Sequence, residues 1–331
     1  MEKAEGLQKQ SIPAVLIVVY RRFHNIPQIV KAAALAGIKQ VYLAIDVPKE
    51  SEQTSEYINN RTIALQECES LSKSFSLNLD VWVRESNLGC AISVITACNW
   101  FFSAENFGIV LEDDCLPSND FFLFVNKHSN LVFENNSIQF LCGTQHAIVR
   151  SLTPDLDYVI STYPFLWGWA TTRDKWFRIE TSFIEERPLK MPANVSIREK
   201  LYWKTGVRRA RQRRVDVWDT IAVAHMVQRN FVSVSPLVNL INNKGLDEYA
   251  TNHRKAKTSK SLSFELELNN SFEDIRYVDK EIRKYFFGIN LYMPIRNLVR
   301  WVLDSIQKSK QPSLSQALKL VLNQNPNQTR E

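Results

Sequence analysis

The sequence predicts an α/β fold in which a mostly parallel sheet is flanked by helices. Two features support it. Short apolar runs alternate with longer helical patterns over the first 145 residues, and charged residues directly follow several of those runs. Strands that alternate with helices form βαβ units, whose sheets are covered on both faces. Ligands of such sheets bind beyond the carboxyl ends of the strands.

Five mostly apolar runs are the expected strands of this first part: Ala14–Tyr20, Val41–Ile45, Leu79–Val83, Phe107–Leu111 and Ile138–Cys142. The expected helices lie between them: Ile26–Gly37, Ser55–Ser74, Cys90–Phe102 and Asn119–Phe133. A glycine such as Gly37 is typical of a helix C-terminus. Asp46, Arg84 and a run of three acids each follow a strand, so we expect them to meet in one crevice.

The second half of the chain is less regular. It contains an aromatic segment, a basic run, a helical pattern, an apolar strand and a polar loop: Tyr163–Thr172, Lys204–Arg214, Val217–Gln228, Phe231–Leu240 and Gly245–Arg254. We divide the chain into an N-terminal extension (1–12), a catalytic domain (13–255) and a helical C-terminal extension (256–331). Within the catalytic domain, 13–145 is expected to bind the nucleotide and 146–255 to face the acceptor.

Charge is distributed unevenly along the chain. Residues 1–150 hold 12 bases and 16 acids, a net of −4, whereas residues 151–331 hold 29 bases and 19 acids, a net of +10. A protein coated with bases for nucleic acid would not show this split, and no RNP, KH or helix-turn-helix signature is present. We therefore expect no nucleic-acid partner, and anions near the second half.

Cysteine usage and the N-terminus indicate a cytoplasmic protein. The five cysteines are an odd number without a CxxC pair, which favours reduced, buried thiols over disulfides or zinc. The first apolar run, Ala14–Tyr20, is too short for a signal peptide or a spanning helix. The expected location is the cytoplasm, with peripheral contact to the inner face of the cytoplasmic membrane as an open option.

The most informative segment is Glu112-Asp113-Asp114, which directly follows an apolar run. Three adjacent acids repel one another and cannot all be cheaply removed from water. A divalent cation such as Mg²⁺ or Mn²⁺ resolves this conflict and can bridge to diphosphate oxygens. The alternative is that the acids sit at the start of a helix, where one acid would suffice.

The segment Leu111–Pro117 resembles the DxD-type motif of nucleotide-diphospho-sugar transferases of the GT-A fold. Further segments occur in the order found in the bacterial HlpA-like glycosyltransferases of polysaccharide gene clusters: Arg84–Cys90, Asn99–Phe102, Asp120–Phe122, Tyr163–Thr171 and Trp218-Asp219. More remotely, the chain is similar to the N-acetylglucosaminyltransferase that starts complex N-glycans. The resemblance covers about residues 13–254.

The resemblance implies a metal-dependent glycosyltransferase that uses Mn²⁺ or Mg²⁺. It would move a sugar from a nucleotide-diphosphate donor to a hydroxyl of a glycan or lipid-linked acceptor in bacterial surface polysaccharide synthesis. The expected donor is a UDP-sugar, and the transfer would invert the configuration of the anomeric carbon. A metal-dependent nucleotidyltransferase or phosphohydrolase that uses the same acids is the alternative, and a basic nucleic-acid-binding protein is a third reading.

The nucleotide site is expected at the ends of the first strands. Tyr20 and Arg21 end the first strand, and Asp46 can accept a hydrogen bond from the base or ribose. The alternative for Asp46 is a turn cap before a proline. Arg84 can pair with phosphate, or form a surface ion pair instead. Asn87 and Gly89 lie just before a helix, and the glycine permits a close backbone approach.

Roles within the acidic run come from the resemblance alone. It implies that Asp114 binds the metal, that Asp113 faces the ribose or the metal through water, and that Glu112 points toward the sugar or the fold. A loop ending at His253 resembles a family segment ending Ala-Thr-His, although Asn252 holds the matching position. A loop could absorb this shift of one residue, so His253 is an expected ligand of the metal or the diphosphate, with a solvated loop histidine as the alternative.

Asp219 is the expected catalytic base, because the resembled Trp-Asp element supplies the acid that activates the acceptor hydroxyl. Thr220 stands where the remote family has a second acid, which leaves three reserve candidates: Asp216, Asp247 and Glu248. The alternative for Asp219 is a helix N-cap.

Trp167, Gly168 and Trp169 are the expected sugar platform, because aromatic faces stack on sugars and glycine permits a close approach. Core packing is the alternative. The basic run Lys204–Arg214 would seat an anionic acceptor or anionic lipid headgroups, or else form a solvated face. Apolar residues at helical spacing over 291–306 could lie on a membrane, dock on the catalytic domain or meet a partner.

Overall fold

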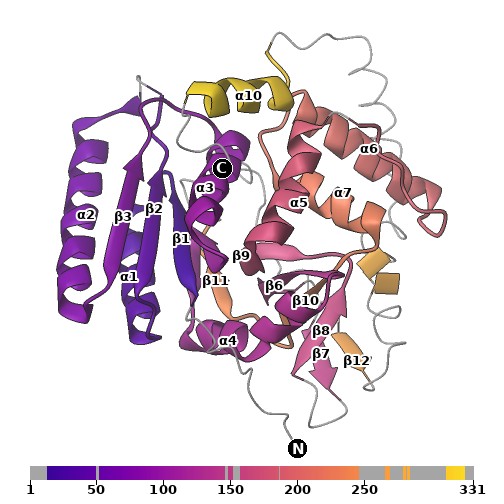
Figure 1. Cartoon of the computed structure of the whole chain (residues 1–331), viewed down its shortest axis with the longest axis horizontal. Coiled ribbons are helices and arrows are strands. Elements are labelled where there is room, and N and C mark those ends of the chain that lie inside the picture. Colours follow the sequence, from indigo (N-terminus) through magenta and orange to yellow (C-terminus); the bar gives the residue numbers. More distant parts are fainter. Residues whose placement is uncertain are drawn as a thin grey trace, which may run out of the picture.

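The computed structural model describes residues 13–49, 52–145, 148–151, 157–185, 187–245, 265–268, 279–280, 282–283 and 311–324. Its centre is an eight-stranded sheet (Figure 1). The strands, in spatial order, are β3 (Asn78–Val83), β2 (Gln40–Ile45), β1 (Ala14–Val19), β4 (Phe107–Glu112), β9 (Phe165–Thr172), β6 (Ile138–Thr144), β10 (Val232–Pro236) and β8 (Tyr158–Ser161).

The first four strands of this order, β3 to β4, are mutually parallel, as the βαβ pattern predicts. β9 enters between β4 and β6 and is antiparallel to both, whereas β10 runs parallel to β6 and antiparallel to β8. Two small sheets pair β5 (Cys115–Pro117) with β11 (Ile241–Asn243) and β7 (Ile148–Ser151) with β12 (Glu265–Leu268).

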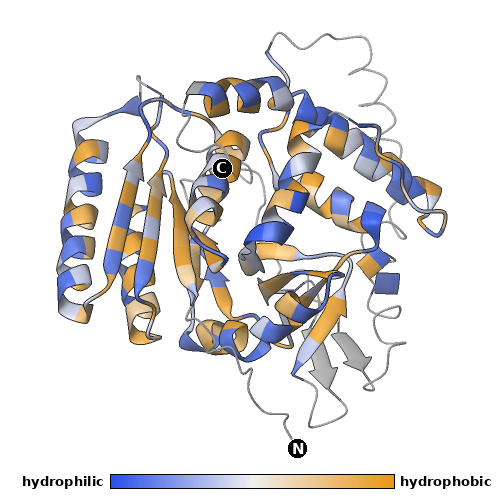
Figure 2. Cartoon of the chain, viewed as in Figure 1, coloured by the Kyte–Doolittle hydropathy of each residue, from blue (hydrophilic) through white to orange (hydrophobic). Residues whose placement is uncertain are grey.

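Helices cover both faces of the sheet. One face packs against α1 (Ile26–Leu35), which follows a short 3₁₀ turn at Phe23–Asn25, and against α2 (Ser55–Phe75) and α4 (Asn119–Glu134). The other packs against α3 (Cys90–Ala104), α5 (Arg173–Ile184), α6 (Ile197–Arg211), α7 (Asp219–Arg229) and α10 (Leu314–Gln324). Alternate residues of β1 belong to the two apolar clusters, so both faces of this strand are buried and it is apolar throughout (Figure 2).

The predicted α/β class, a largely parallel sheet flanked by helices, is confirmed. The division into three segments stays a prediction, but α10 packs on the part formed by residues 13–255: Leu314 and Leu318 are fully buried in the cluster shared with α3 and α5. Earlier in the expected C-terminal extension, Asp279 also contacts this part: it accepts hydrogen bonds from the Ser161 and Thr162 hydroxyls, at 2.8 and 2.5 Å. The apolar pattern over 291–306 lies outside the described residues.

No helix in the described ranges is long and apolar enough to cross a membrane. All five cysteines are free thiols, and four of them are buried. This agrees with the expectation of reduced, buried thiols.

Candidate functional site

The acidic run lies at the carboxyl end of β4, the strand beside β1 in the middle of the sheet. Glu112 is the last residue of β4 and is half-buried. Asp113 and Asp114 form the turn that leads into β5. The acidic run thus lies at a strand end, as predicted. The carboxyl ends of β1, β2 and β3 lie at the same edge of the sheet, because these strands are parallel to β4.

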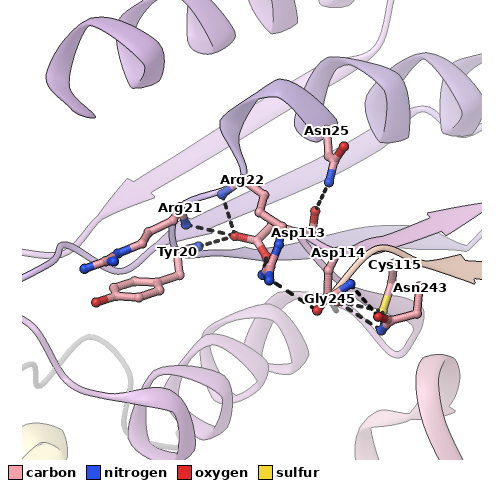
Figure 3. Close-up of polar contacts among 9 residues, drawn as sticks. All are labelled: Tyr20, Arg21, Arg22, Asn25, Asp113, Asp114, Cys115, Asn243 and Gly245. Atoms are coloured by element: carbon pink, nitrogen blue, oxygen red, sulfur yellow. Dashed lines mark hydrogen bonds and ion pairs between the residues drawn. The ribbon is translucent and has the colours of Figure 1, made fainter. Parts of the chain in front are cut away.

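Asp113 organises the chain that leaves β1 (Figure 3). Its Oδ2 accepts hydrogen bonds from the backbone N–H groups of Tyr20, Arg21 and Arg22, at 2.8, 3.0 and 3.1 Å. Asn25 donates from Nδ2 to the Asp113 carbonyl oxygen at 2.8 Å. Only 5% of Asp113 is exposed. Its carboxylate thus holds the backbone of the expected nucleotide cradle.

Asp114 has a different environment. Its Oδ1 accepts hydrogen bonds from Cys115 Sγ at 3.2 Å and Asn243 Nδ2 at 3.4 Å. Its Oδ2 lies 3.8 Å from Arg22 Nη1. A Cβ at Gly245 would sit 2.2 Å from Oδ2, so only glycine fits there without a shift. The pairing of β11 with β5 brings Asn243 and Gly245 to Asp114 (Figure 3).

Glu112 lies among other acids and has a perturbed pKa. Burial raises the pKa of Glu112 to about 8. The nearby carboxylates Asp114, Asp113 and Asp219 add to this rise, and the hydrogen bond with Trp218 opposes it. Burial and the neighbouring acids therefore both disfavour the ionised form of Glu112.

Asp114 is the acid of the run that fits a divalent cation. It offers a hard carboxylate oxygen, whereas the Asp113 carboxylate already accepts three backbone N–H bonds. Burial, and next the charge of Asp113, raises the pKa of Asp114, so a cation would relieve a real electrostatic cost. In the described ranges no three His, Cys, Asp or Glu side chains could together hold a metal. Mg²⁺ usually takes one or two carboxylates and completes its shell with phosphate and water.

Asp46 and Arg84 lie at the ends of β2 and β3 as predicted, and both are buried. Asp46 accepts a hydrogen bond from the Leu88 N–H at 3.1 Å, and Asn87 Nδ2 donates to the Val47 carbonyl at 2.6 Å. Burial raises the pKa of Asp46 to about 6. Asp46 therefore holds the loop before α3 in place. This structural role is close to the turn cap that was the alternative to nucleotide binding.

Arg84 is a buried cation. Its guanidinium lies 3.2 Å from the ring centroid of Trp82, and burial lowers its pKa to about 9. Nη2 donates to the Ser93 carbonyl at 3.4 Å, whereas Nε and the Ser93 hydroxyl have no hydrogen-bond partner among the described residues. Unsatisfied buried polar groups are costly, so this corner of the site carries a polar cost that the described residues do not relieve.

Asp216, a reserve candidate for the base, caps helix α3. Its carboxylate accepts hydrogen bonds from the backbone N–H groups of Cys90 at 2.7 Å and Ala91 at 2.9 Å. Gly89 makes this possible: its φ is +78°, and a Cβ there would sit 2.4 Å from Asp216 Oδ2. A residue of the acceptor-side half thus fixes the start of a donor-side helix.

Asp216→Ala should lower the free energy of unfolding by about 2 kcal/mol, because the first turn of α3 loses both acceptors. Urea unfolding measures this. Asp174→Ala, which removes an exposed acid from the first turn of α5, should cost less than about 0.5 kcal/mol. Unchanged stability together with lost turnover in Asp216→Ala would instead make Asp216 a catalytic group.

Asp219 is exposed and is the first residue of α7. Its Oδ1 accepts a hydrogen bond from the Thr220 N–H at 2.6 Å. The N-cap of α7 is Trp218, so Asp219 lies one residue past the N-cap position that was its alternative role. The charge of Asp219 helps to raise the pKa of Glu112, so the two carboxylates are near enough to interact electrostatically.

The aromatic segment belongs largely to the core. Trp169 is 1% exposed and packs against Trp176 and Trp218, with ring centroids 5.8 and 5.7 Å apart. Its burial favours core packing over a sugar platform. Gly168 has a φ of +69°, and a Cβ there would meet Ile241 at 2.7 Å, so this glycine serves the contact between β9 and β11. Trp167 is half-buried, so of the two tryptophans Trp167 and Trp169 it is the one whose side chain keeps exposed surface.

Trp169→Ala should lower the free energy of unfolding by about 3–5 kcal/mol, because it leaves a large cavity among three aromatic rings. Trp167→Ala should cost clearly less, since part of its ring is already in water. Chemical unfolding of the two variants side by side checks this order. A smaller loss for Trp169→Ala would contradict its placement in the core.

Three expected site residues, His253, Asp247 and Glu248, lie outside the described residues. The structure adds Arg22, Asn25 and Asn243, which the sequence did not point to. Asn25 precedes the helix by one residue and reads as a cap, yet its side chain makes no cap bond and binds Asp113 instead. Asn243 had no signal, since its role depends on strand pairing.

No family model and no curated protein matches the chain. Among solved structures it is similar to apo UDP-glucose pyrophosphorylase, with a TM-score of 0.37 and 12% identity over 70% of this chain and 92% of that one. It is also similar to 4-diphosphocytidyl-2C-methyl-D-erythritol synthase from Anaerococcus prevotii, with a TM-score of 0.32 and 7% identity over 83% and 98% of the two chains. HddC from Yersinia pseudotuberculosis, complexed with GMP-PN, is similar with a TM-score of 0.29 and 10% identity, over 53% of this chain and 80% of that one. Likenesses at these scores say nothing about the activity of this chain.

Proposed function

We propose that this chain is a metal-dependent glycosyltransferase that moves a sugar from a nucleotide-diphosphate donor to a hydroxyl of a glycan or lipid-linked acceptor in bacterial surface polysaccharide synthesis. The proposed donor is a UDP-sugar. The observation that carries the proposal is the division of labour in the acidic run. Asp113 holds the backbone at the end of β1, and Asp114 keeps a carboxylate suited to a cation beside it.

Donor binding is assigned to the edge formed by β1, β2 and β3. Tyr20 and Arg21 present the backbone that Asp113 fixes, and the Arg21 guanidinium pairs with Glu52. Arg84 offers a buried positive charge for phosphate. Gly89 leaves room for the Asp216 carboxylate at the start of α3, not for the nucleotide. A divalent cation on Asp114, with His253 as a second ligand, would neutralise charge on the diphosphate leaving group.

Asp219 is assigned the proton transfer. As the acceptor oxygen bonds to the anomeric carbon, the Asp219 carboxylate takes the hydroxyl proton, and the bond from that carbon to the diphosphate breaks with its electron pair. A single displacement of this kind inverts the anomeric configuration. Trp218 fixes the start of α7 by packing against Trp169 and bonding Glu112, which steadies Asp219.

A thermal-shift panel of nucleoside diphosphates, with and without Mn²⁺, tests donor binding, and mass spectrometry of UDP-sugar hydrolysis tests transfer chemistry. We expect stabilisation by UDP that requires Mn²⁺ and slow release of UDP from a UDP-sugar. Pyrophosphate release from a nucleoside triphosphate and a sugar phosphate, without UDP-sugar hydrolysis, would replace the proposal with nucleotidyl transfer. No response to any nucleotide would refute both.

A further inference from the structure

The outward face of α6 carries a stripe of side chains that sugar transfer does not use. Its members recur every three or four residues, which places them on one face of the helix: Ile197, Leu201, Lys204, Arg208 and Arg211. Ile197 is 85% exposed, the highest value among the large apolar side chains of the described ranges. Lys204 is exposed as well, and the other three are half-buried.

The stripe lies on the side of α6 away from Asp219. Gly206 packs against the first turn of α7, because a Cβ there would lie 3.0 Å from Thr220 Cγ2. Lys204 and Arg208 are each two residues from Gly206, which turns them roughly 200° around the helix. The stripe is therefore separated from the candidate base by the thickness of a helix, about 10 Å.

A groove of about 560 Å³ runs beside the stripe, between α6, the segment at Pro188 and the start of α10. Lys204, Arg208 and Arg211 line it, and none of its lining residues is acidic. The Arg211 guanidinium donates to the carbonyl oxygens of Arg187 and Glu185, at 2.7 and 3.2 Å. These carbonyl groups hold the Arg211 guanidinium in place beside the groove.

Bases far outnumber acids in the sequence around the stripe. Residues 187–214 contain ten bases and one acid, Glu199. Glu199 is fully buried, accepts hydrogen bonds from Tyr163 and Trp203, and lies 3.5 Å from Arg283 Nε. Bases in the last turn of a helix stabilise its dipole, but Lys204 lies in the middle of α6.

We propose that this face of α6 docks on a membrane that contains anionic phospholipids. Lys204, Arg208 and Arg211 would meet the phosphate headgroups, and Ile197 would enter the interface beside them. A soluble phosphate ligand would use the cations alone, whereas an apolar side chain that is 85% exposed at the end of the same stripe gains free energy only by leaving water. The proposal is independent of sugar transfer.

Vesicle co-sedimentation of the full chain tests it, with phosphatidylcholine vesicles alone and with phosphatidylglycerol added. We expect binding only to the anionic vesicles. Lys204→Gln/Arg208→Gln should weaken it about thirtyfold, because each base near an anionic surface contributes a roughly fivefold gain. Ile197→Ser/Lys204→Gln alters two exposed side chains, so it should fold normally and also lose binding. The matched control Lys31→Gln/Lys73→Gln removes two exposed bases from α1 and α2, across the molecule from α6 (Figure 1), and should bind as before.

The proposal is wrong if both stripe variants bind anionic vesicles like the unmodified chain, if the control loses binding equally, or if pure phosphatidylcholine binds as well. A parallel thermal shift with inorganic phosphate separates the sources of phosphate. Stabilisation by inorganic phosphate that needs Lys204, with no vesicle binding, would make the groove a site for a soluble ligand and exclude the membrane.

Discussion

Asp114→Asn should lower Mn²⁺-dependent nucleotide binding by about a hundredfold or more, since changes one shell further out from a metal already cost about 10–100-fold. The amide keeps an oxygen that can accept from Cys115 and Asn243, so the turn should stay in place. What it loses is the negative charge and the second hard oxygen. Isothermal titration with UDP, with and without Mn²⁺, isolates the metal-linked part.

The same variant should be no less stable than the unmodified chain without metal. Burial and the charge of Asp113 raise the pKa of Asp114, which means that folding disfavours its ionised form, and the neutral amide removes that cost. Asp120→Asn, the same change at an exposed acid in the first turn of α4, is the control and should leave nucleotide binding intact. Metal-linked binding that survives in Asp114→Asn would show that the metal assignment is wrong.

Asp219→Asn should lower the rate of sugar transfer by about 10²–10⁴-fold, the usual contribution of a general base, while UDP binding changes little. The amide cannot take the acceptor proton, but it can still accept from the Thr220 N–H. Quenched-flow or end-point product analysis gives the rate, and titration with UDP and Mn²⁺ gives the affinity.

Asp174→Asn is the matched control for that experiment, because Asp174 is an exposed acid in the first turn of α5. It should leave both rate and affinity unchanged. Full turnover in Asp219→Asn would exclude this residue as the base and move the search to Asp247 and Glu248. Lost UDP affinity together with lost rate would mean that Asp219 acts on the donor instead.

The sequence predicted best those parts of the fold that depend on local pattern. β1, β2 and β4 are largely apolar runs, as expected for strands buried on both faces, whereas the edge strand β3 is mostly exposed. The ends of these strands place Asp46, Arg84 and the acidic run on one edge. β5 and β11 are only three residues long and exist because they pair, so no local pattern marks them. The antiparallel entry of β9 is likewise a property of the assembled sheet.

The candidate site shows the same limit. The acidic run was recognisable because three adjacent acids after a buried strand are expensive. The separate tasks of its members were not, because they depend on remote partners: Asp113 meets residues 91 to 93 positions away, and Asp114 meets Asn243 across 129 positions. Asp216 reaches Cys90 across 126 positions, so its capping role was equally hidden.

The burial of α10 sets a timetable for synthesis. Leu314 and Leu318 fill the apolar cluster between α3 and α5, so that surface stays uncovered on a growing chain until residue 318 has been made. At 5–20 residues per second, the interval between residue 255 and residue 318 lasts roughly 3–13 s. During that time residues 13–255 are complete in sequence yet lack part of their core. The nascent chain is therefore a natural client for chaperones over that interval.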